Sequence, residues 1–70
     1  MDIDHRRLLA DYGVWPSEMA DDTPEGRAAL AERVARICGR MRESGLAGDY
    51  AYSLPDHRSM VRLLKALQRN

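Results

Sequence analysis

The sequence has a single cysteine, Cys38, and only two histidines, His5 and His57. One thiol excludes an intramolecular disulfide and any zinc site built from clustered cysteines. The two histidines show no metal-ligand spacing, so we expect neither a metal nor a cofactor. We interpret Cys38 as a small buried hydrophobic residue and not as a nucleophile.

Long apolar runs and glycine-rich loops are also missing. No stretch approaches the ~18 apolar residues that a membrane span needs, and the opening Met-Asp-Ile-Asp differs from the basic and then apolar start of a secretory signal. The five glycines are dispersed, which excludes the usual phosphate-binding loops. So short a chain has little room for a water-excluded pocket. We therefore expect a cytoplasmic protein that is not an enzyme.

The composition is that of a folded domain. Of the 70 residues, 44% are hydrophobic and 31% charged, which is typical of a soluble globular chain. The length fits one domain over residues 1–70. At this size the hydrophobic core offers no surplus over the conformational entropy lost on folding, and disulfides and metals are excluded. We therefore predict that a homodimer completes the fold.

The first quarter of the sequence predicts a short helix followed by an acidic turn. Asp2 or Asp4 caps a helix of about nine residues, and Gly13 ends it in the left-handed conformation. The proline that follows Trp15 forces that tryptophan into an extended backbone conformation. Residues 17–23 are acidic and rich in turn formers, with one helical turn at most.

Two longer helices are predicted to form an antiparallel hairpin over residues 24–68. The first covers 24–44, because Thr23 is a good N-cap and Gly45 a good stop signal. The second covers about 54–68 and follows a capping box. The short N-terminal helix packs across this hairpin, which makes the fold all-α with three helices. The residues predicted to form the core or a dimer interface are Leu30, Val34, Ile37, Met41, Leu63, Leu64 and Leu67.

The net charge is zero, but the charges are unevenly distributed. Residues 1–26 carry a net charge of −5, and residues 27–70 carry +5. On the C-terminal helix, one face opposite the leucines is entirely basic. It consists of Arg58, Arg62, Lys65 and Arg69. This face either is solvated, pairs with the acidic segment of its own chain or of a second subunit, or contacts the phosphates of nucleic acid. The acids of that segment are Glu18, Asp21, Asp22 and Glu25.

The long helix also carries arginines opposite its core, but glutamates flank them. Glu32 precedes Arg36 by four residues, the favourable orientation for an ion pair. This pattern predicts an exposed face with salt bridges. The arginines are Arg33, Arg36 and Arg40, and the glutamates are Glu25, Glu32 and Glu43.

The aromatic residues are few, and the only tryptophan is Trp15. It either plugs the bottom of the helical hairpin or anchors a partner, because tryptophan and tyrosine dominate interface hot spots. Together with Trp15, Tyr12, Tyr50 and Tyr52 form one aromatic patch if the first helix ends near residues 46–53.

The function predicted from these features is that of a small regulatory or inhibitor protein. It would bind a larger protein through the aromatic residues, and small regulators encoded by phages or mobile elements fit this profile. The alternative is a DNA-binding transcriptional regulator that uses the basic face of the C-terminal helix. Against this alternative, the connection of about eight residues between the two long helices exceeds the turn of a helix-turn-helix.

Overall fold

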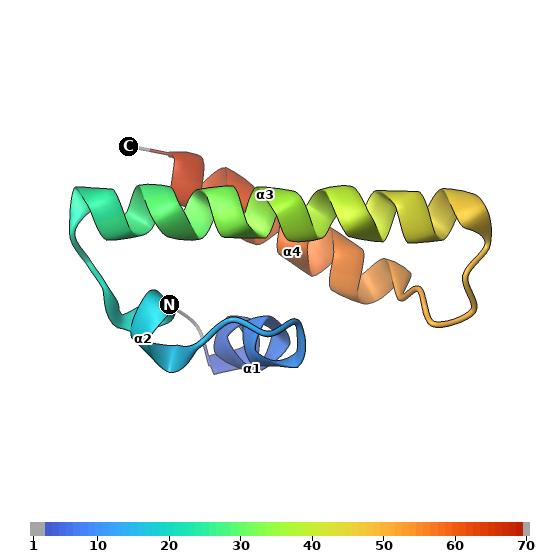
Figure 1. Ribbon diagram of the computed structural model, residues 1–70, viewed down its shortest axis with the longest axis horizontal. Helices are drawn as coiled ribbons and strands as arrows, with labels where there is room; N and C mark the ends of the chain where they lie inside the picture. The colour runs from blue at the N-terminus through green and yellow to red at the C-terminus, as the bar shows by residue number, and fades with distance from the viewer. Residues whose placement is uncertain (1–2, 70) are drawn as a thin grey trace.

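The computed structural model describes residues 3–69, and over this range it is entirely helical outside the connections (Figure 1). The helices are α1 (Ile3–Asp11), α2 (Pro16–Ala20), α3 (Pro24–Ala47) and α4 (Leu54–Gln68). The predicted all-α class is confirmed. The helical turn expected from Ser17 is a five-residue helix, α2, which begins at Pro16, so the described residues form four helices and not the three predicted. The cap role of Asp2 or Asp4 falls outside the residues and side chains that the structure describes.

The two long helices form the expected hairpin. Figure 1 shows α3 running the length of the molecule and α4 returning across it, with α1 and α2 on one side. α4 packs against both α3 and α1, and α2 contacts α1 and α3. Of the described helices, none packs against the outer face of α3, which is the side opposite its buried residues.

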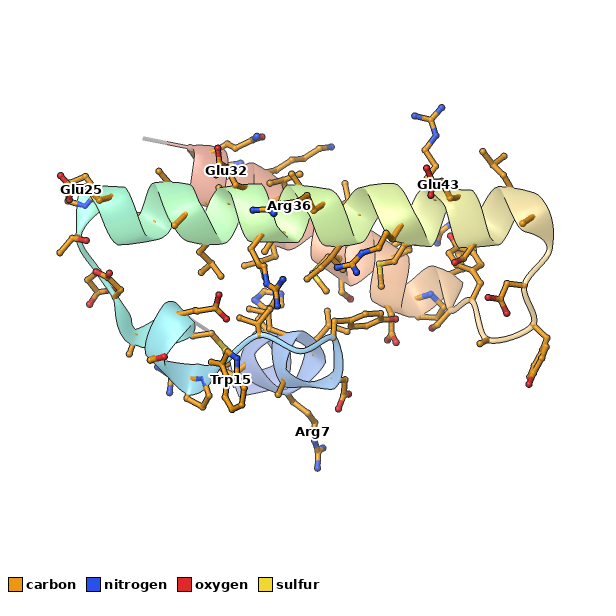
Figure 2. The ribbon with its side chains drawn as sticks, viewed as in Figure 1. Arg7, Trp15, Glu25, Glu32, Arg36 and Glu43 are labelled. Atoms are coloured by element: carbon orange, nitrogen blue, oxygen red, sulfur yellow. The ribbon has the colours of Figure 1, made fainter. Side chains whose placement is uncertain are left out.

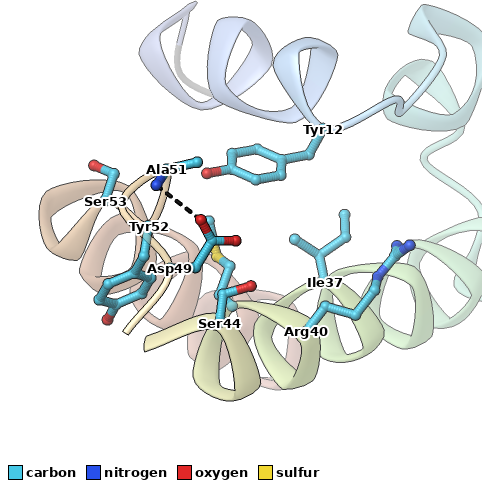
Figure 3. A pocket seen from close by; sticks show the side chains of 9 residues that line it. Tyr12, Ile37, Arg40, Ser44, Asp49, Ala51, Tyr52 and Ser53 are labelled. Atoms are coloured by element: carbon cyan, nitrogen blue, oxygen red, sulfur yellow. Dashed lines mark hydrogen bonds between the residues drawn. The ribbon is translucent and has the colours of Figure 1, made fainter. Parts of the chain in front are cut away.

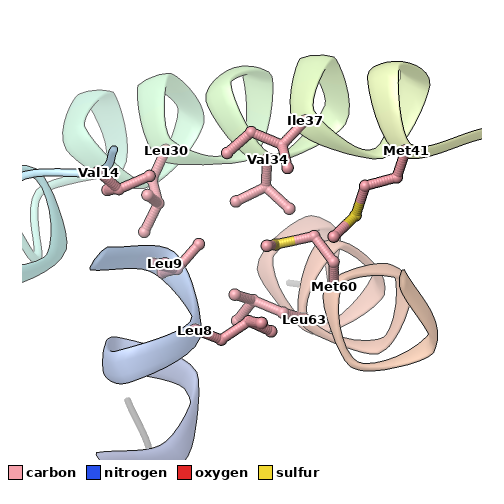
Figure 4. Close-up of a cluster of buried hydrophobic side chains, with 9 residues drawn as sticks. All are labelled: Leu8, Leu9, Val14, Leu30, Val34, Ile37, Met41, Met60 and Leu63. Atoms are coloured by element: carbon pink, nitrogen blue, oxygen red, sulfur yellow. The ribbon is translucent and has the colours of Figure 1, made fainter. Parts of the chain in front are cut away.

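A single hydrophobic core lies where α1, α3 and α4 meet (Figure 4). Apolar residues at spacings of three and four give α3 one buried stripe, as amphipathic helices require. At the margin of the core, Leu64 and Leu67 are half-buried. The buried residues are Leu8, Leu9, Val14, Leu30, Val34, Ile37, Met41, Met60 and Leu63.

α3 begins at the predicted place because its first turn is capped from outside. The Thr23 hydroxyl oxygen accepts a hydrogen bond from the Gly26 backbone N–H at 3.0 Å. Asp21 Oδ1 in turn accepts from the Thr23 hydroxyl at 2.6 Å and from the Thr23 N–H at 3.0 Å. These bonds, above all the one from the hydroxyl, lower the pKa of Asp21.

The end of α3 was predicted wrongly. The helix passes Gly45 and ends at Ala47, with Gly48 in the left-handed conformation at φ 73°. The Gly48 N–H donates to the Gly45 carbonyl and the Asp49 N–H donates to the Ser44 carbonyl, a Schellman motif. Gly45 has a different role, since a β-carbon there would lie 3.1 Å from the ring of Tyr52. Glycine at position 45 makes room for that ring.

Two tyrosines tie the start of α4 to the rest of the chain. Tyr52 in the preceding connection is hydrogen-bonded through its hydroxyl to His57 Nδ1 at 2.6 Å. Tyr12, just after α1, points its hydroxyl at Asp56 Oδ2 from 3.4 Å. Burial and the neighbouring Asp56 carboxylate raise the pKa of Tyr12. The first turn of α4 is thus held on two sides.

Candidate functional site

The corner between α1 and α2 is a tight reversal of the chain built on Gly13. This glycine has a φ of 86°, a conformation that residues with a β-carbon rarely adopt. The Gly13 N–H donates to the Ala10 carbonyl, and the Val14 N–H donates to the Leu9 carbonyl at 3.0 Å. The turn folds Val14 back over the core, where it is 3% exposed.

Trp15 consequently points outward. Side chains of successive residues in extended backbone alternate between opposite sides, so a buried Val14 places the next side chain in solvent. Trp15 has φ −76° and ψ 149° and is 71% exposed. Figure 2 shows it on the edge of the α1 and α2 layer that faces away from α3. The interpretation of Trp15 as a plug of the hairpin is therefore wrong, and Val14 fills that position.

Side chains from α2 and α3 hold the corner in place. Glu18 Oε2 accepts the Trp15 backbone N–H at 2.7 Å. Arg33 Nη2 donates to the Gly13 carbonyl at 3.0 Å, and Arg33 Nε lies 3.9 Å from Glu18 Oε1. The backbone on both sides of Val14 is thus fixed to α3. The tryptophan side chain is exposed on a rigid support.

This role of Arg33 corrects one prediction for the long helix. Arg33 is half-buried beneath the corner, because α2 folds back onto that side of α3. Arg36 and Glu32 are exposed as predicted, but no ion pair within 4.0 Å joins them. Among the described side chains, the pair between Arg33 and Glu18 is the only salt bridge.

The predicted aromatic patch does not form. Tyr12 and Tyr52 line one cavity of about 310 Å³ between the end of α1, α3 and the connection to α4 (Figure 3). Within that connection the Asp49 carboxylate accepts the Ala51 N–H at 2.9 Å. Neither Trp15 nor Tyr50 lines the cavity, and Tyr50 is 100% exposed in the connection. The aromatic residues are therefore divided among three places.

The basic face of α4 is fully presented to solvent. The side chains of Arg58, Arg62 and Lys65 are all exposed, and so is that of Arg69, which follows the helix as its C-cap. None lies within 4.0 Å of an acid among the side chains that the structure describes. Glu18 of the acidic segment is paired with Arg33 instead. The pairing of this face with acids of its own chain is thus not formed within the described part.

Cys38 lies beside the core of α3 and is half-buried. Burial raises the pKa of its thiol, which keeps the thiol protonated and weakly nucleophilic. Within residues 3–69, no three histidine, cysteine or acidic side chains are grouped closely enough to hold a metal ion. Of the helices described, none has both the length and the apolar character needed to cross a membrane.

The corner with Trp15 and the basic face of α4 are the two described surfaces where residues predicted to bind a partner are exposed. Comparison of the chain with protein-family models, with curated proteins and with solved structures found no match.

Proposed function

We propose that the protein is a non-enzymatic cytoplasmic regulator or inhibitor that binds a larger protein and uses Trp15 as its anchor. The observation that carries this proposal is the 71% exposure of Trp15 on a corner fixed by Arg33 and Glu18. A large aromatic side chain gains most from leaving water at an interface. An anchor whose backbone is already rigid loses little entropy on binding.

The other aromatic residues contribute less to such an interface. Tyr12 and Tyr52 are engaged in hydrogen bonds to α4 and are half-buried. Tyr50 is exposed, but it lies in the connection at the other end of α3 from α2 (Figure 1). The proposed binding surface is therefore centred on Trp15 alone.

Affinity capture with matched variants tests this proposal. Trp15→Ala is expected to cost about 2 kcal/mol or more of binding free energy, which is about thirtyfold in affinity. The measurement is quantitative mass spectrometry of proteins captured saturably from a host lysate. Tyr50→Ala removes an aromatic side chain that is even more exposed, and it should leave capture unchanged. A captured protein that both variants retain equally would contradict the role of Trp15.

The proposal includes a homodimer. Leu46 in the last turn of α3 is 81% exposed. No described helix covers the outer face of α3. An exposed leucine on an uncovered helix face favours association with another chain. Sedimentation equilibrium of the purified protein tests this part of the proposal.

Nucleic-acid binding through α4 is a second candidate function. It is favoured by the exposure of three basic residues on one face of α4 and of Arg69 at its C-cap, none of which has an acid within 4.0 Å among the described side chains. The topology differs from that of a helix-turn-helix motif. Six residues, 48–53, separate α3 from α4, and the two helices are antiparallel (Figure 1). Such binding would depend on phosphate contacts and less on reading bases.

Duplex binding at several salt concentrations tests this second candidate. The double variant Arg58→Gln and Arg62→Gln should weaken binding and reduce the slope of affinity against salt by about two phosphate contacts. The double variant Arg6→Gln and Arg7→Gln removes the same charge from exposed residues of α1 and serves as the control. If both double variants weaken binding equally, the α4 face is not a specific nucleic-acid site.

A further inference from the structure

The outer face of α3 has a regular pattern of exposed residues. They recur at alternating spacings of four and three over about 27 Å of helix, the spacing at which one helix packs along another. Leu46 is the largest apolar residue among them, and around Gly39 there is open space where a β-carbon would lie. Figure 2 shows Glu32 of this face on the edge of α3 that points away from α1 and α2. The six residues are Ala28, Glu32, Ala35, Gly39, Arg42 and Leu46, and all are exposed.

These six positions are complementary to themselves when the helix is reversed about residue 37. Leu46 then lies opposite Ala28, so that the large side chain meets a small one. Glu32 lies opposite Arg42, so that an acid meets a base. Ala35 lies opposite Gly39 at the centre, where two crossing helices come closest. A two-fold interface needs this kind of self-complementary surface, in which residue i contacts residue j and j contacts i.

We propose that a second copy of this chain packs antiparallel along the outer face of α3, with the two-fold axis near Ile37. This inference rests on the homodimer part of the proposed function and assigns its interface. Charge complementarity identifies the occupant, because Glu32 and Arg42 have no described ion-pair partner within 4.0 Å in their own chain. An antiparallel copy supplies both partners, twice per dimer. A parallel copy would place Glu32 near Glu32 and Arg42 near Arg42, which is repulsive.

The margin of this interface is also consistent with an antiparallel pair. Arg36 comes near the two-fold axis in both copies, but its side chain is exposed, so solvent and salt screen the two like charges. The basic face of α4 is not complementary to itself. All of its charged residues are basic, so the same face of a second copy would repel it. Self-association is therefore assigned to α3.

Charge reversal with sedimentation equilibrium tests the interface. Glu32→Arg and Arg42→Glu should each weaken self-association by at least about tenfold, since each places like charges opposite one another twice per dimer. An equimolar mixture of the two variants should associate again, because every acid in the mixed dimer faces a base. Arg62→Glu makes the same charge change on α4 and should leave self-association unchanged. Failure of the mixture to associate would overturn the antiparallel arrangement.

A substitution at the centre separates the interface from folding. Gly39→Gln enters open space in the single chain and favours the helix, so helical content by circular dichroism should be retained or raised. In the dimer it blocks the close approach of the two helices and should weaken association by at least about tenfold. A wild-type chain that is monomeric at high micromolar concentration would overturn both the homodimer and this interface. A dimer that tolerates Glu32→Arg and Gly39→Gln would overturn only the interface.

Discussion

Replacement of Leu9 by alanine is expected to destabilise the fold by about 3 kcal/mol. Leu9 is completely buried where α1 meets α3 and α4, and its removal loses apolar transfer free energy and leaves a cavity. A domain of this size has a total stability of about 4 to 10 kcal/mol. The loss is therefore a large share of the total. Chemical denaturation followed by circular dichroism measures it as a lower midpoint.

The same chemical change on the surface provides the control. Leu46→Ala removes an 81% exposed side chain and should change the unfolding free energy by less than about 0.5 kcal/mol when the chain is monomeric. If Leu9→Ala were equally mild, α1 would not be an integral part of the core. The contrast thus tests whether the N-terminal helix is docked as the structure shows.

Two glycines are expected to respond to alanine in opposite directions. Gly13 has a positive φ, so Gly13→Ala should destabilise the fold by about 1 to 2 kcal/mol. Gly39 lies in the middle of α3 with open space around it, so Gly39→Ala should stabilise the monomer by about 0.5 to 1 kcal/mol. Thermal or chemical unfolding at low protein concentration measures both changes.

The sign of the change in unfolding free energy tests each of these two expectations. A destabilising Gly39→Ala would show that a neighbour already packs closely on this face within the single chain. A neutral Gly13→Ala would show that the corner after α1 adopts a different backbone conformation. Gly48 also has a positive φ, and Gly48→Ala should behave like Gly13→Ala.

Local sequence signals predicted the parts of the fold that local interactions determine. The start of α3 depends on the Thr23 hydroxyl, a proline and the first-turn N–H groups, all within four residues. The start of α4 depends in the same way on Ser53. The buried stripe of α3 follows from helical periodicity. Such signals need no knowledge of the rest of the chain.

The errors arose where distant residues decide between local alternatives. Gly45 and Gly48 are both good stop signals, but α3 ends at the second, and Gly45 lies against the ring of Tyr52 from beyond the helix. Arg33 lies on the helix face away from the core stripe, but the short α2 folds back over it. Periodicity within one helix contains no information about either contact.

The candidate site around Trp15 was predicted only in part, because its geometry also depends on distant residues. Pro16 indicated that Trp15 would be extended, and alternation then required Val14 and Trp15 to point to opposite sides. Which of the two is buried depends on the space that α1 and α3 leave, and the smaller valine occupies it. The aromatic patch failed because Gly13 turns the chain between Tyr12 and Trp15, so these two side chains separate.

The outward position of Trp15 has a practical consequence for spectroscopy. The chain has one tryptophan, and its indole is already in water in the folded state. Its fluorescence therefore changes little on unfolding and responds to the arrival of a partner that covers it. The helical circular dichroism signal, by contrast, is lost on unfolding and changes little when a partner covers Trp15. Folding and binding of the unlabelled protein thus have separate optical signals.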